Sequence, residues 1–83
     1  MKVISLIINR GVLIQEVNVF NIQGSSIEKL ESVYTTIPYL EEVFVDLSER
    51  FETKYILIPN DNDIQKQMVE KHNFIIFNIE EHE

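Results

Sequence analysis

Three short segments of this chain are apolar at almost every position, and they constrain the fold more than any other feature. The segments are residues 3–8, 55–58 and 74–79. Runs of this length are too short to span a membrane and are typical of β-strands that are buried on both faces. Sheets with two buried faces are covered by helices, so the runs predict an α/β fold with an α+β-like order of elements.

A turn signal follows the first run. Asn9 and Gly11 tolerate the left-handed backbone that tight hairpin turns need, and polar residues interleave with apolar ones over residues 12–20. We therefore expect an antiparallel hairpin at the start of the chain. Its first strand is expected to lie in the centre of the sheet, whereas its second strand is half-buried and suited to an edge.

A helix is predicted over residues 26–36. Ser25 and Glu28 have the spacing of a capping box, and the apolar residues that follow have helical spacing: Ile27, Leu30, Val33, Tyr34 and Ile37. Pro38 ends this helix or begins the next one. The second helix carries an apolar stripe of Leu40, Val43, Phe44, Leu47 and Phe51. Residues 42–47 also alternate, so a strand there stays open as the alternative.

The last third of the chain has the pattern of a βαβ unit. Residues 55–58 form a strand, a helix capped by Asn62 or Asp63 ends at His72 and Asn73, and residues 74–79 form the final strand. The two strands should be parallel with a right-handed crossover. The prediction is one domain over residues 1–83, with a four-stranded mixed sheet, about three helices, the order ββααβαβ and a disordered acidic tail at 80–83.

Charge and composition bound the function. The 83 residues include 14 acids, 7 bases and no cysteine, with a formal charge of −7. This balance argues against direct binding to nucleic acid or to anionic membranes and favours a protein partner with a basic surface. The lack of cysteine excludes disulfides and thiolate metal sites and fits the cytoplasm. Thirteen Ile, seven Asn and no Ala suggest an A+T-rich bacterial or phage gene.

No catalytic constellation is apparent, so the chain is predicted to be non-enzymatic, without catalytic residues, cofactor or metal. Two glycines cannot build a dinucleotide-binding or Walker loop, and the two histidines have no metal-ligand spacing. Four residues are weak ligand-site candidates. Ser25 and Ser26 precede a predicted helix, where backbone N–H groups bind anions. Asp61 and Asp63 follow a predicted parallel strand, where ligands bind in open sheets.

Interaction candidates lie on the second predicted helix. Glu42, Asp46 and Glu49 fall at i, i+4 and i+7 opposite the apolar stripe, with carboxylates about 6 Å apart. Such a row could imitate nucleic-acid phosphates, or it could be the solvated face of an amphipathic helix. Tyr39 stands between the two helices, where an exposed aromatic side chain could anchor an interface.

These observations support three functional hypotheses. The first is a small interaction or regulatory protein that acts through a protein–protein interface. A phage gene is one source considered for it. The second is an acidic inhibitor that blocks a nucleic-acid-binding protein by charge mimicry. The third is a small-molecule binder or enzyme at the carboxyl ends of the strands. Because three short helices cannot cover both faces of four strands, a homodimer that covers the remainder is expected about as strongly as a monomer.

Overall fold

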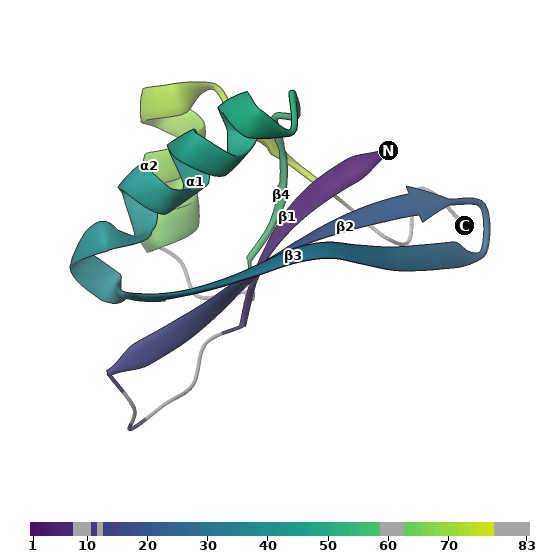
Figure 1. The fold of residues 1–83 in the computed structure, drawn as a ribbon. Coiled ribbons are helices and arrows are strands. Elements are labelled where there is room, and N and C mark those ends of the chain that lie inside the picture. The colour runs from purple at the N-terminus through teal and green to yellow at the C-terminus, as the bar shows by residue number, and fades with distance from the viewer. Residues whose placement is uncertain (8–10, 12, 59–62, 78–83) are drawn as a thin grey trace.

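The computed structural model describes residues 1–7, 11, 13–58 and 63–77. The strands are β1 (Lys2–Ile7), β2 (Ile14–Gln23), β3 (Ser26–Thr36), β4 (Tyr55–Leu57) and β5 (Ile75–Ile76). The helices are α1 (Leu40–Arg50) and α2 (Asp63–His72), and a 3-10 turn, η1 (Ile37–Tyr39), precedes α1. Within the described residues the chain is one compact α/β domain in the order βββαβαβ (Figure 1).

The five strands form one mixed sheet in the order β3-β2-β1-β4-β5. β1 pairs antiparallel with β2 and parallel with β4, and β4 pairs parallel with β5. This confirms the hairpin, the central place of the first strand and the parallel pair at the end of the chain. The expected edge position of the second strand is wrong, because β2 also pairs along its whole length with β3.

The prediction of a helix over residues 26–36 is also wrong, because this segment forms strand β3. The sheet therefore has five strands rather than four, and two α-helices are described rather than three. Gln23 pairs with Ser26 across a two-residue turn in which Gly24 has a φ of 58°. A glycine with positive φ is what such a hairpin turn requires, so Gly24 begins a turn and Ser25 caps no helix.

The other helices agree with the sequence patterns. Residues 42–47 lie inside α1, which excludes the alternative of a strand there. The helix buries Leu40, Phe44 and Leu47, which are members of the predicted stripe. α2 ends at His72, and Asn73 follows it with a φ of 58°. Asparagine tolerates this left-handed conformation after a helix, as the sequence pattern indicated.

Both helices cover the same face of the sheet (Figure 1). The connections from β3 to β4 and from β4 to β5 step across the sheet in one direction, and right-handed crossovers then place both helices on one side. The core lies between them and the sheet. Its buried members are Ile4, Leu6, Val17, Val19, Leu40, Phe44, Leu47, Ile56, Ile58, Met68 and Phe74.

The opposite sheet face, here called the helix-free face, is nevertheless not open at its centre. Val3 and Asn18 are each 1% exposed, although the strand register places both on this face. Asn18 donates to a Glu16 carboxylate oxygen at 2.7 Å and accepts from Ser32 at 2.6 Å. Among the described residues, the large exposed apolar side chains of this face lie near its margins. The predicted turn at residues 9–11 lies largely, and the acidic tail at 80–83 entirely, outside the described residues.

Candidate functional site

At one end of the sheet, β2 begins and β3 runs into η1 (Figure 1). Several exposed apolar side chains belong to these segments and to the end of β1. Ile14 pairs with Thr36, the residue before Ile37, and Glu16 pairs with both Ile7 and Tyr34. We call this group the end patch. Its members are Ile7, Leu13, Ile14, Tyr34, Ile37 and Tyr39.

The backbone around Pro38 keeps Tyr39, a member of the end patch, exposed to solvent. Pro38 supports the 3-10 turn η1, which redirects the chain from β3 into α1 and leaves Tyr39 at the N-cap of the helix. Tyr39 is 58% exposed and Tyr34 is 65% exposed. A tyrosine contributes about 150–250 Å² when it is fully buried, so these two rings alone leave roughly 200 Å² accessible. Groups of exposed apolar side chains are often found at binding sites.

The acidic row is placed as the sequence predicted. Glu42, Asp46 and Glu49 are exposed on α1, and they line one side of an open groove of about 470 Å³. Glu41, Val45 and His72 complete the lining, so the groove runs between α1 and the end of α2. Because Glu42 is one helical turn from Tyr39, the acidic row continues from the edge of the end patch.

Part of this negative charge is neutralised. Nε2 of His72 lies 2.6 Å from Oε1 of Glu41, and Nζ of Lys71 lies 3.9 Å from the same atom. The hydrogen bond from His72, with smaller contributions from Lys71 and the charge of His72, lowers the pKa of Glu41. Partners of this kind are not seen for Glu42 and Glu49 within the described residues.

Arg50 forms the second charged contact of α1. Its guanidinium makes two hydrogen bonds of 2.8 Å to Glu31 on β3 and lies 3.6 Å from Asp46. These acids, Glu31 first, raise the pKa of Arg50, and the pair fastens the end of α1 to the middle of β3. Asp46 therefore has a cationic neighbour, which the described residues do not provide for Glu42 or Glu49.

The weak ligand candidates are not brought together. Ser25 and Ser26 are exposed in the turn and at the start of β3, so the expected helix N-terminus for anion binding does not exist there. Asp63 is the exposed first residue of α2, whereas Asp61 lies outside the described residues. In the described part of the chain, no three His, Asp or Glu side chains converge to hold a metal ion.

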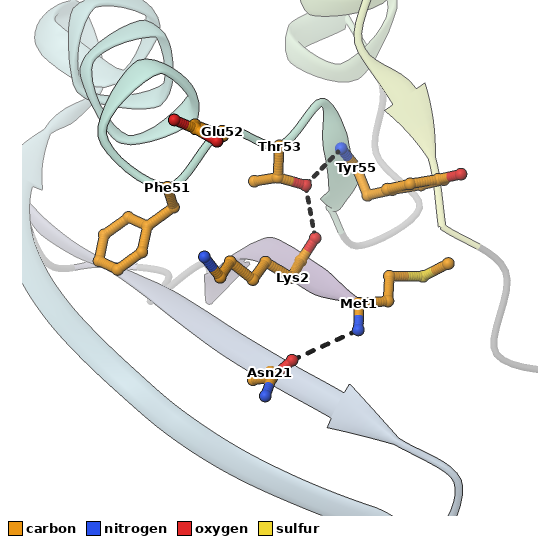
Figure 2. A pocket seen from close by; sticks show the side chains of 7 residues that line it. All are labelled: Met1, Lys2, Asn21, Phe51, Glu52, Thr53 and Tyr55. Carbon is orange, nitrogen blue, oxygen red and sulfur yellow. Dashed lines mark hydrogen bonds between the residues drawn. The ribbon is translucent and has the colours of Figure 1, made fainter.

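A cavity of about 390 Å³ opens at the start of β1, at a place that no sequence motif marked (Figure 2). Its hydrogen bonds serve the fold. Thr53 donates to the carbonyl of Lys2 at 2.6 Å and accepts from the Tyr55 N–H at 3.3 Å. The Met1 ammonium donates to Asn21 at 3.3 Å, and the Lys2 ammonium lies 6.0 Å from the Phe51 ring centre. These contacts join β1, β2 and β4 and define no catalytic group.

Comparisons with protein-family models, with curated proteins and with solved structures give no match. Neither of the described helices combines the length and apolarity that a membrane span requires. The site must therefore be judged from its own geometry. Sequence reasoning found Tyr39 and the acidic row but missed the rest of the end patch. The missed signal is the pair Gly24-Ser25, a two-residue hairpin turn that would have placed Tyr34 and Ile37 beside Ile14.

Proposed function

We propose that this chain is a non-enzymatic interaction protein whose partner binds the end patch. The single observation that supports this most strongly is the gathering of six exposed apolar side chains from β1, the start of β2, β3 and η1. Such side chains lower the solubility of a protein that has no partner for them. Tyrosine is also among the residues that contribute most to binding energy at interfaces, so Tyr39 and Tyr34 are the expected anchors.

The adjoining acidic row indicates the chemistry of the partner. Interfaces have an apolar centre with a polar rim, and rim charges steer association more than they strengthen it. Here the end patch supplies the centre, while Glu42 and Glu49 supply negative charge on one side. The partner is therefore a protein with an apolar surface bordered by Lys or Arg side chains.

A capture experiment with matched variants tests this proposal. The tagged chain is used to capture proteins from a lysate of its host, together with Tyr39→Ala, Ile37→Ser and the control Ile75→Ser. Ile75 is 50% exposed on β5, at the opposite edge of the sheet. Loss of the same captured protein in the first two variants, and its retention in the control, supports the proposal. Equal capture by all of the variants contradicts it.

Charge mimicry of nucleic acid is the second candidate, and the open groove beside Glu42, Asp46 and Glu49 favours it. Reversing these three charges to Lys changes the net charge from −7 to −1. A control that reverses the exposed acids Glu28, Asp63 and Glu70 makes the same change elsewhere. Mimicry requires that only the first triple variant loses the partner, and that the partner is released as salt rises towards about 0.5 M. An equal effect of both triple variants would contradict it.

A further inference from the structure

β3 leaves one of its two backbone edges unpaired among the described residues, since it lies at the end of the strand order and pairs only with β2. It is also the longest strand, with eleven residues. A free edge of this length offers N–H and C=O groups to any further strand. Proteins usually protect such an edge with lysine, proline or a β-bulge.

The two halves of the β3 edge differ in this protection. Its first half has charged residues at Glu28 and Lys29, and a bulge at Leu30 follows, because Val19 pairs with Glu31 while Phe20 pairs with Lys29. Beyond Glu31, residues 32–36 read Ser-Val-Tyr-Thr-Thr and are paired regularly with β2. This second half has no charge and no proline, and most of its residues favour strands.

We infer that this second half pairs antiparallel with the same segment of a second copy of the chain. The pairing is centred on Tyr34, so that Tyr34 faces its own copy, Val33 faces Thr35 and Ser32 faces Thr36. The two sheets then continue into one ten-stranded sheet across a two-fold axis. This inference does not depend on the proposed partner of the end patch, although the dimer places two end patches side by side.

The uncharged sequence of residues 32–36 is what allows a second copy to pair with this segment. Each copy has a charge of −7, so two copies associate only where they oppose no like charges. The register centred on Tyr34 has no charged residue between Ser32 and Thr36 on either strand. A register centred on Leu30 would oppose Lys29 and Glu31, but the bulge places these two side chains on opposite faces. Aromatic pairs and threonine-rich pairs across strands are favourable, which suits the Tyr34 register.

Single-cysteine variants test the register, because the chain has no cysteine of its own. In the inferred dimer, two copies of residue 34 have Cα atoms about 4.5–5.5 Å apart, which lies within the range of a disulfide. Two copies of residue 32 are about 13 Å apart, and two copies of residue 27 are about 45 Å apart, at 3.3 Å per residue. Tyr34→Cys should therefore cross-link rapidly under mild oxidation, whereas Ser32→Cys and Ile27→Cys should not. A mixture of Ser32→Cys and Thr36→Cys should form the mixed dimer.

Sedimentation of the intact chain gives the second readout. The wild type is expected to form a dimer of twice 9.8 kDa at roughly 100 μM, as for a small transient interface. Tyr34→Lys opposes two ammonium groups and should weaken the dimer at least tenfold. Ile27→Lys is the matched control, since Ile27 is 68% exposed on the same strand and the same face. It should leave the dimer unchanged.

Three results would overturn the inference. They are a wild type that sediments only as a 9.8 kDa species, equal cross-linking rates for Tyr34→Cys and Ile27→Cys, and equal weakening by Tyr34→Lys and Ile27→Lys. Circular dichroism of each variant shows that the fold is retained. The proposed function is tested separately through Tyr39, because Tyr39→Ala should abolish partner capture and leave the dimer intact.

Discussion

Replacing Glu52 by glycine should stabilise the protein. Glu52 follows the C-terminus of α1 with a φ of 52°, in the left-handed region. The Phe51 N–H donates to the Leu47 carbonyl at 2.9 Å, and the Thr53 N–H donates to the Ser48 carbonyl at 3.1 Å. The second bond is the long-range bond of a Schellman motif, in which the left-handed residue is usually glycine. A glutamate at this place is therefore unfavourable for the backbone.

The magnitude follows from two opposing effects. The left-handed conformation costs an L-residue about 1–2 kcal/mol, and glycine is free of this cost. Glycine in turn loses more chain entropy on folding, about 0.5–1 kcal/mol. The net stabilisation is then about 0.5–1 kcal/mol, and for a domain of this size the melting temperature should rise by about 3–6 °C. Removal of a carboxylate from the negative end of α1 acts in the same direction.

Thermal and urea unfolding at pH 7, followed by circular dichroism, measure this effect. Glu52→Ala is the control, because it removes the same charge but keeps a side chain at positive φ. Glu52→Gly should exceed Glu52→Ala in stability by about 0.5–1 kcal/mol. The reasoning is refuted if the two variants are equally stable, since the backbone conformation of residue 52 would then cost nothing.

Two further predictions concern the α1 helix. The pKa of Glu41 is lowered in the folded protein, chiefly by the hydrogen bond from His72. Ionised Glu41 therefore stabilises the fold at pH values above its usual pKa of 4.5. This stabilisation is lost as the pH falls through the lower pKa of the folded state. The difference in melting temperature between wild type and Glu41→Gln should therefore be larger at pH 7 than at about pH 3, and equal differences would contradict this. Phe44 is 0% exposed and packs edge-on against Phe74 with ring centres 6.3 Å apart. Phe44→Ala should cost about 3–5 kcal/mol in urea unfolding, and a loss below about 1 kcal/mol would show that the core repacks.

Local patterns in the sequence were sufficient for the parts of the fold in which one periodicity dominates. The stripe containing Phe44 and Leu47 defines α1, and the carboxylates of Glu42, Asp46 and Glu49 follow from it because they lie on the same helix. The run at residues 3–8 likewise places β1 in the centre of the sheet. These features need no knowledge of which segments meet in space.

The end patch could not be predicted in the same way, because it depends on contacts between distant segments. Ile14 and Tyr34 are brought together only when β3 pairs with β2. The position of both helices on one face also follows from the strand order, which the sequence does not display. Once residues 26–36 were interpreted as a helix, Tyr34 became a core residue and the cluster around Tyr39 could not be found.

The β-bulge at Leu30 explains both the error and the inferred dimer. In a regular strand, Ile27 and Tyr34 are seven positions apart and would point to opposite faces. The extra residue in β3 returns both to the helix-free face, so apolar residues at i, i+3 and i+7 imitate the period of a helix. The same bulge interrupts the free edge, and it separates the uncharged residues 32–36 from the first half of β3, which carries Glu28 and Lys29. Deletion of Leu30 should therefore make the pairing of β2 with β3 continuous, because Lys29 and Glu31 would become neighbours opposite Phe20 and Val19, and it should keep Ile27 on the helix-free face and lengthen the edge that is free to pair.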